Sequence, residues 1–244
     1  MSTAAVLVIG NEILSGRTRD ANVAYLGAEL AGLGITLAEV RMVRDDTDAI
    51  VEALNHLRRT FTYVFTSGGI GPTHDDITAA AVAAAFGVAL ERDPEAVGLL
   101  AVRYGAEDLN AARLKMADVP KGATLIANPV SQAPGFRVEN VFVLAGVPRI
   151  LQAMFDGLKG SLVGGPPQQS RSITLAVREG DLADGLALIQ AAHPETEIGS
   201  YPSFTEGRSL VTVVARGIHG TRLDEALAET RALAKRLGAP VLDP

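Results

Sequence analysis

The sequence predicts an α/β fold with a mainly parallel sheet, followed by a small α+β domain. Short apolar and β-branched runs alternate with longer stretches of helical spacing over roughly the first 160 residues, which is the pattern of βαβ units. A Gly- and Pro-rich stretch at 160–169 then interrupts the alternation and has the composition of a linker. After it, strand and helix patterns restart in the order βαββα, which is typical of a split βαβ module. The expected domains are therefore 1–162 and 170–244.

The first 66 residues hold three expected strands and two expected helices. The run 4–9 is continuously apolar, as in a strand buried on both faces. Asp20 is a candidate N-cap for a helix that ends at Gly34, and Thr47 opens a second helix. Further strands are expected at 36–43 and 61–66, the second of which is rich in aromatic and β-branched residues.

The remaining elements are predicted from the same two signals, short apolar or β-branched runs for strands and helical spacing of apolar residues for helices. A helix is expected to begin near Asp75 or Asp76, and further helices at 93–104, 108–117 and 148–158. A strand at 124–127 precedes a hairpin of 136–138 and 141–144 that turns at Glu139-Asn140. In the second domain the expected order is strand 171–177, helix 181–192, strands 195–201 and 208–216, and helix 221–237.

Ligands of open parallel sheets bind beyond the carboxyl ends of the strands. The loop after the third strand, from Thr66 to Thr78, is the most informative part of the sequence. It contains Gly68, Gly69 and Gly71 and leads into a helix. Glycines let successive backbone amides converge on an anion, and a helix N-terminus adds partial positive charge. We expect these glycines, with the hydroxyls of Ser67 and Thr73, to bind a phosphate group.

Two carboxylates, Asp75 and Asp76, follow this loop. They would repel a phosphate unless a cation lies between them, and Mg²⁺ is typically held by one or two carboxylates together with substrate phosphates. The sequence therefore predicts a divalent metal, Mg²⁺, bound by Asp75 and Asp76. The alternative is that Asp75 caps the helix and the glycines form only a tight turn.

Other candidate ligand-binding residues lie in the neighbouring loops. Asn11 and Glu12 follow the first strand and should lie beside the glycine-rich turn, where Glu12 could be a second metal ligand. Asp45, with Asp46, either caps a helix or supplies a further carboxylate. Asn128 and Gly135 belong to a polar, rigid loop that either contacts the ligand or is only a turn.

Composition excludes several classes of protein. With 22 basic against 28 acidic residues and no basic run, the chain lacks the positive surface that nucleic-acid binding needs. It has no cysteine, which excludes disulfides and thiolate chemistry. Its apolar amino-terminal run is too short for a signal peptide or a membrane span. We expect a cytoplasmic protein that acts on a phosphorylated small molecule, a nucleotide or a pterin.

Several segments of the sequence together resemble the molybdopterin-binding (MoCF biosynthesis) domain, and more closely the amino-terminal part of the competence/damage-inducible protein A (CinA) family. The segments are G-N-E-I-L-S-G-R (10–17), D-A-N-V-A-Y-L (20–26), R-D-D (44–46), T-S-G-G-I-G-P-T-H-D-D-I-T (66–78), N-P-V-S-Q-A-P-G-F (128–136) and L-A-G-V-P (144–148). The carboxyl-terminal part, with I-G-S-Y-P-S (198–203), resembles the small domain that follows in that family and in eukaryotic FAD synthases. Ala145 departs from the family pattern, which usually has proline there.

The resemblance implies a three-layer MogA-like fold with its site at the carboxyl ends of the strands. It implies either metal-dependent hydrolysis of a nucleotide pyrophosphate such as ADP-ribose or FAD, or binding or adenylylation of molybdopterin. In the molybdopterin branch, the positions that the resemblance ties to activity are Asp45 and Asp76. For the hydrolase, Asp45 or Glu12 is the candidate general base. A non-catalytic nucleotide-binding module is the third alternative, and a homo-oligomer, dimer or trimer, is expected.

Overall fold

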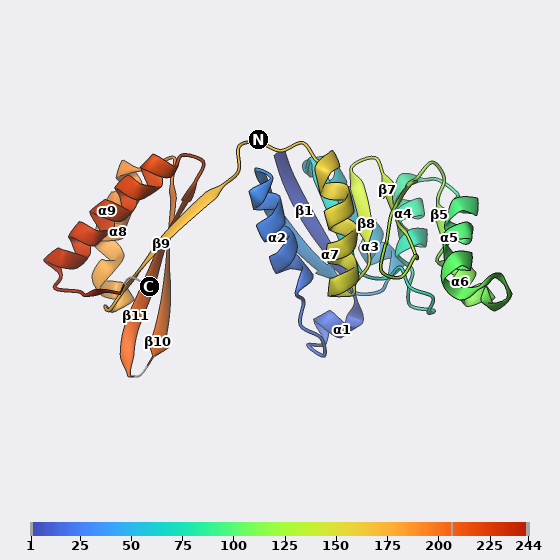
Figure 1. Ribbon diagram of the computed structural model, residues 1–244, viewed down its shortest axis with the longest axis horizontal. Helices are drawn as coiled ribbons and strands as arrows, with labels where there is room; N and C mark the ends of the chain where they lie inside the picture. The colour runs from blue at the N-terminus through green and yellow to red at the C-terminus, as the bar shows by residue number, and fades with distance from the viewer. Residues whose placement is uncertain (1, 206, 243–244) are drawn as a thin grey trace. The chain divides into compact units, whose positions relative to one another are not determined.

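The computed structural model describes residues 2–205 and 207–242. The chain forms two compact units, and the boundary between them lies between Gly165 and Pro166 (Figure 1). Each unit has its own sheet and its own apolar core.

The sheet of the first unit has six strands in the order β2-β1-β3-β8-β7-β6. The four parallel strands are β2 (Ile35–Val43), β1 (Ser2–Ile9), β3 (Tyr63–Ser67) and β8 (Val141–Leu144). Two antiparallel strands, β7 (Gly135–Val138) and β6 (Thr124–Ile126), complete one edge. The predicted, mainly parallel sheet and the hairpin are thus confirmed.

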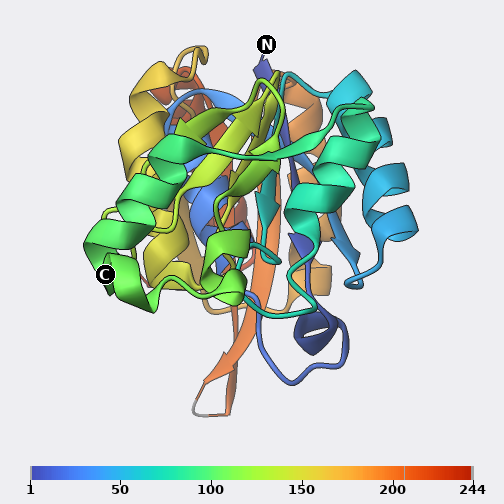
Figure 2. The same ribbon diagram turned by 90° about the vertical axis from the view of Figure 1, so that its right-hand side faces the viewer.

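Helices cover both faces of this sheet and produce three layers (Figure 2). One face packs on α2 (Asn22–Gly32) and α7 (Pro148–Leu158), where Phe65 lies between Phe142 and Phe155 at ring-centroid distances of 5.2 and 5.6 Å. The other face packs on α3 (Thr47–Thr60) and α4 (Thr78–Phe86). Because side chains alternate along each strand, the continuous apolar run of β1 supplies both cores.

The segment between α4 and β6 is more finely divided than its pattern predicted. A helix α5 (Pro94–Tyr104) forms as expected, but the helix expected at 108–117 is reduced to the short helix α6 (Ala111–Lys115), which a 3₁₀ turn (Ala106–Asp108) precedes. Asn110 caps α6, because its side chain accepts a bond from the Arg113 amide (3.0 Å), and a new helix therefore begins after Asn110. The short strands β4 (Leu90–Arg92) and β5 (Asp118–Pro120), which pair with each other, were not predicted, nor was the four-residue helix α1 (Asn11–Leu14).

Asp46 is the N-cap of α3, since its Oδ1 accepts a bond from the Ala49 amide at 2.9 Å. We expect Asp46→Ala to lower the free energy of unfolding by about 1 kcal/mol, as loss of a helix cap does. Asp46→Asn retains an acceptor oxygen and should lose much less in a urea denaturation series. Equal losses for the two variants would mean that the charge of Asp46, not its capping bond, stabilises the helix.

The stretch 160–169, expected to be a linker, is packed against the first unit along half of its length. A 3₁₀ turn (Lys159–Ser161) follows α7, Leu162 is buried in the core, and the Gly165 amide donates to the Gly34 carbonyl at 3.0 Å. A Cβ on Gly164 would overlap the Leu33 carbonyl oxygen, so glycine is required for this close approach. Only 166–168 lie between this segment and the first strand of the second unit.

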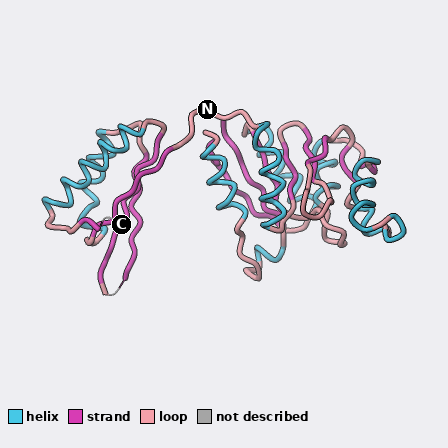
Figure 3. The backbone as a smooth tube through the Cα atoms, in the orientation of Figure 1, coloured by secondary structure: helices cyan, strands magenta, loops and turns pink. Residues whose placement is uncertain are grey.

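The second unit is a four-stranded antiparallel sheet with two helices (Figure 3). The strand order is β10 (Glu197–Thr205), β11 (Arg208–Gly217), β9 (Gln169–Leu175) and β12 (Val241–Leu242), and the helices are α8 (Glu179–Ala192) and α9 (Gly220–Arg236). The βαββα order is as predicted, with β12 added. Ile173, Val213 and Leu223 contribute to its buried core.

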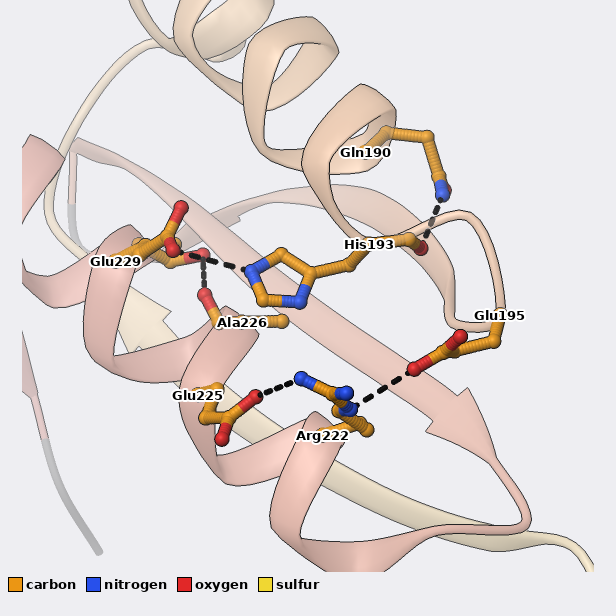
Figure 4. A network of polar contacts seen from close by, with 8 residues as sticks. Gln190, His193, Glu195, Arg222, Glu225, Ala226 and Glu229 are labelled. Carbon is orange, nitrogen blue, oxygen red and sulfur yellow. Dashed lines mark hydrogen bonds and ion pairs between the residues drawn. The ribbon is translucent and has the colours of Figure 1, made fainter.

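Polar contacts link the end of α8 to α9 (Figure 4). His193 Nε2 lies 3.1 Å from Glu229 Oε1, and Arg222 lies 2.9 Å from Glu195 and 3.0 Å from Glu225. The two pairs of Arg222 are exposed, and exposed ion pairs contribute about 0–1 kcal/mol each, so apolar packing is the main source of this unit's stability. No helix within 2–205 and 207–242 is both long enough and apolar enough to cross a membrane.

Candidate functional site

A cleft of about 510 Å³ opens at the carboxyl edge of the parallel strands. Its walls come from the loops after β1, β3 and β8, from the 128–133 loop, and from the helical segment that contains α5 and α6. Predicted site residues in its lining are Glu12, Gly68, Gly69, Gly71, Asp76 and Asn128. The cleft therefore lies where parallel sheets bind their ligands.

The glycine-rich turn is held in a conformation that only glycine adopts easily. Gly68 and Gly69 have φ values of 110° and 69°. A Cβ on Gly68 would lie 2.2 Å from the Ile9 carbonyl oxygen, and a Cβ on Gly69 would lie 2.2 Å from Thr78 Oγ1. Thr78 fastens the turn to α4, because its hydroxyl donates to the Gly68 carbonyl (2.9 Å) and its amide donates to the Gly69 carbonyl (3.0 Å).

Three successive amides of this turn are available to a ligand. Among the described residues, the N–H groups of Gly69, Ile70 and Gly71 have no protein acceptor, and all three residues line the cleft. Backbone amides arranged in this way beside a helix N-terminus can bind an anion. The conformation of the turn thus provides the donors that a phosphate group requires.

The two aspartates lie in the turn before α4, because that helix begins at Thr78 and not at Asp75 or Asp76 as expected. Asp76 Oδ2 accepts bonds from the amide (2.8 Å) and the hydroxyl (2.6 Å) of Thr73, which folds the turn on itself. The Thr73 hydroxyl also approaches Asp75, and this hydrogen bond holds the pKa of Asp75 below its usual range. Asp75 and Thr73 are exposed and do not line the cleft, whereas Asp76 is half-buried and does.

Asp76 is the carboxylate best placed to hold a cation next to a bound phosphate. Its Oδ1 has no hydrogen-bond partner among the described residues, while Glu12 reaches the same cleft from the loop after β1. No cluster of three or more acidic or histidine side chains that could hold a metal exists within the described ranges. An ion here would complete its shell with phosphate and water oxygens, as Mg²⁺ commonly does.

Asp45, Asn11 and Ser67 form contacts that keep them out of the cleft. Asp45 accepts a bond from the Asn11 amide at 2.9 Å, at the start of α1, and neither residue lines the cleft. Ser67 is 2% exposed and its hydroxyl accepts a bond from Asn22 Nδ2. The sequence could not predict this, because the partner of Ser67 is Asn22 on α2, 45 positions away in the chain.

Asn128 and Gly135 shape the loop before β7. Asn128 Nδ2 donates to Ser131 and Ala133, and its Oδ1 accepts from two backbone amides, so all its bonds are internal to the loop. Gly135 does not line the cleft; a Cβ there would lie 2.2 Å from the Val143 carbonyl oxygen. Glycine at 135 therefore permits close strand packing.

Two residues without an assigned role in the sequence interpretation contact this region. Lys115 Nζ donates to the Thr73 carbonyl at 2.6 Å and lies beside a smaller cavity that adjoins Gly69 and Asp76. Asn22 bonds to Ser67 and to the Gly146 carbonyl. The sequence contains no signal for Lys115, because a single lysine on a short helix belongs to no recognisable motif. Asn22 was equally hard to identify, because an asparagine at the start of a helix is typical of a capping residue.

Lys115 connects α6 to the turn that carries the aspartates, so its loss should loosen the site without removing it. We expect Lys115→Met to weaken phosphate-ligand binding about fivefold, the equivalent of roughly 1 kcal/mol for one exposed charge-assisted bond. Isothermal titration would measure this. Lys121→Met, which removes an exposed pair with Glu91, is the matched control and should leave affinity unchanged. Equal affinities of the two variants would show that Lys115 does not support ligand binding.

Fold and cleft together define a MogA-like α/β protein with a glycine-rich turn at the carboxyl edge of its sheet. The model of the probable molybdopterin binding domain matches residues 5–163, and that of the FAD synthase middle domain matches residues 167–238. The chain belongs to the molybdopterin-binding domain family, in its CinA-like branch.

Relatives match both units of the chain. A protein of Aeropyrum pernix is 36% identical over 243 residues, 94% of this chain and 90% of its own. A CinA-like protein of Syntrophus aciditrophicus is 37% identical over 85% of this chain, which spans about half (53%) of that relative. The crystal structure of the protein CinA with unknown function from Thermoplasma acidophilum superposes with a TM-score of 0.63 at 36% identity, over 66% of this chain and 97% of that one.

Proposed function

We propose that this protein is a divalent-metal-dependent hydrolase of a dinucleotide-type pyrophosphate such as ADP-ribose or FAD. The observation that carries the proposal is that Gly69, Ile70 and Gly71, whose amides have no acceptor among the described residues, line the same cleft as two carboxylates, Asp76 and Glu12. The amides would bind one phosphate of the diphosphate. Asp76 would hold the cation, which would neutralise charge on the transition state and lower the pKa of a bound water.

The reaction requires water to attack one phosphorus atom while its bond to the bridging oxygen breaks. A base must take a proton from the water, and the bridging oxygen leaves with the second phosphate, so ADP-ribose yields AMP and ribose 5-phosphate. Glu12 is the better candidate base, since it lines the cleft while Asp45 is bonded to the Asn11 amide outside it.

The alternative with specific support is a molybdopterin-binding or molybdopterin-adenylylating protein, because the family model for the larger unit is that of a probable molybdopterin binding domain. The same amides would then bind the pterin phosphate. The match of residues 167–238 to the FAD synthase middle domain favours neither the hydrolase nor the molybdopterin-binding protein.

The deciding experiment incubates the purified protein with FAD and with ADP-ribose, with Mg²⁺ or with a chelator, and measures AMP by chromatography. We expect AMP release only with the metal. Tight molybdopterin binding without release of AMP from either compound would favour the alternative. Metal-independent nucleotide binding without turnover would instead support a non-catalytic binding module.

A further inference from the structure

A buried carboxamide lies directly behind the glycine-rich turn. Asn22, the first residue of α2, is only 4% exposed. Its Nδ2 donates to Ser67 Oγ at 2.8 Å and to the Gly146 carbonyl at 2.7 Å, which joins the end of β3 to the loop after β8. Its Oδ1 is buried and has no hydrogen-bond partner among the described residues.

The orientation of this amide is fixed by chemistry. A carbonyl oxygen can only accept hydrogen bonds, so the atom 2.7 Å from the Gly146 oxygen must be the nitrogen of Asn22. Turning the amide over would bring two acceptor oxygens into contact. The unpartnered atom is therefore an acceptor, and a buried acceptor without a donor is costly enough that proteins rarely retain one without a reason.

A small cavity of about 60 Å³ adjoins Asn22, Ser67 and Gly146. Four of its lining residues, Glu12, Thr18, Gly146 and Pro148, also line the large cleft, so the two spaces lie next to each other. Glu12, Asp20 and Arg19 line the small cavity, and the two carboxylates against one guanidinium leave a net negative charge that disfavours a second phosphate. Its size and charge suit one small, uncharged polar group.

Ser67 further restricts which ligand group could bind in this cavity. Its Oγ accepts the bond from Asn22, and its own hydroxyl hydrogen has no acceptor in the part of the chain that the structure describes. Asn22 and Ser67 both line the cavity, and among the described residues they have one unpartnered acceptor, Asn22 Oδ1, and one unpartnered donor, the Ser67 hydroxyl. A ligand hydroxyl, which both donates and accepts, is the group that satisfies the pair.

We propose that Asn22 and Ser67 bind a sugar hydroxyl of the ligand whose phosphate lies on the amides of 69–71. The inference rests on the proposed function for the position of the phosphate and adds recognition of the ribose. It makes Asn22 a specificity-determining residue. A site built to bond a hydroxyl rejects the analogue that lacks it, because the buried polar groups are then left unpaired.

The test compares ADP, 2′-deoxy-ADP and 3′-deoxy-ADP by isothermal titration against the wild-type protein in the presence of Mg²⁺. We expect at least one deoxy form to bind at least tenfold more weakly than ADP. Asn22→Ala should abolish that discrimination, while Asn55→Ala, at a half-buried position of α3 that lines neither cavity, should retain it. The ligand comparison uses the unaltered protein and so does not depend on the folding of any variant.

Equal binding of the three nucleotides by the wild type would overturn the inference. So would an Asn22→Ala protein that loses affinity for all three in the same proportion, because Asn22 would then only position the two loops. No binding of ADP, with FAD or ADP-ribose still hydrolysed, overturns the ribose site and leaves the proposed function standing. Absence of turnover together with normal discrimination overturns only the hydrolase.

Discussion

Asp76→Asn is expected to reduce AMP release from ADP-ribose or FAD by at least about a hundredfold, the scale of loss when a single group that stabilises transition-state charge is removed. The substitution keeps the size of the side chain but removes its negative charge. Asp76 lines the cleft, its Oδ1 has no hydrogen-bond partner in the described part of the chain, and its Oδ2 accepts bonds from the Thr73 amide and hydroxyl. The variant should therefore lose the cation while the turn remains largely in place.

The control for this experiment is Asp48→Asn, which alters an exposed acidic residue in the first turn of α3. It changes net charge by the same amount away from the cleft and should retain wild-type turnover. Steady-state rates at several Mg²⁺ concentrations separate the two effects of losing Asp76. A rate restored by high Mg²⁺ indicates weaker metal binding, whereas undiminished activity at all concentrations would contradict the role of Asp76.

Gly68→Ala is the second substitution with a large expected effect. The new Cβ would lie 2.2 Å from the Ile9 carbonyl oxygen at a φ of 110°, so β1 and β3 would have to separate or the turn would have to change its path. We expect a loss of about 3 kcal/mol in unfolding free energy, from backbone strain and overpacking together. Nucleotide binding should be lost as well, because a changed backbone path at residue 68 would displace the amides of residues 69–71, which come next in the chain.

Gly98→Ala is the matched control for the glycine substitution. Gly98 lies inside α5 with open space where its Cβ would be. Alanine is favoured over glycine in a helix by roughly 0.5–1 kcal/mol, so this variant should be slightly more stable than the wild type. Chemical denaturation followed by circular dichroism would measure both. A Gly68→Ala protein as stable as wild type would show that the turn is not constrained as described.

The sequence was sufficient to predict the sheet and its helices because their signals are local. β1 is a continuous apolar run buried on both faces, and α3 has an acidic cap followed by Ile50, Leu54 and Leu57 on one buried face. The predicted helix starts were wrong where a polar side chain changes the local path of the backbone. Asp76 bonds back to Thr73 and delays α4, and Asn110 restarts a helix that the periodicity had continued.

The candidate site was only partly predictable for a different reason. Glycines and acids that follow one strand are visible as a pattern, so Gly69, Gly71 and Asp76 could be chosen from the sequence. Which side of the sheet a residue faces, and what it meets there, depends on tertiary contacts. Ser67 bonds to Asn22, 45 positions away, and Lys115 reaches Thr73 across 42 positions.

A crystal structure of the protein with Mg²⁺ and the α,β-methylene analogue of ADP-ribose tests the account most directly. One phosphate should accept hydrogen bonds from the amides of Gly69, Ile70 and Gly71, with the ion between that phosphate and Asp76. A diphosphate bound elsewhere, or at this turn with no ion near Asp76, would contradict it.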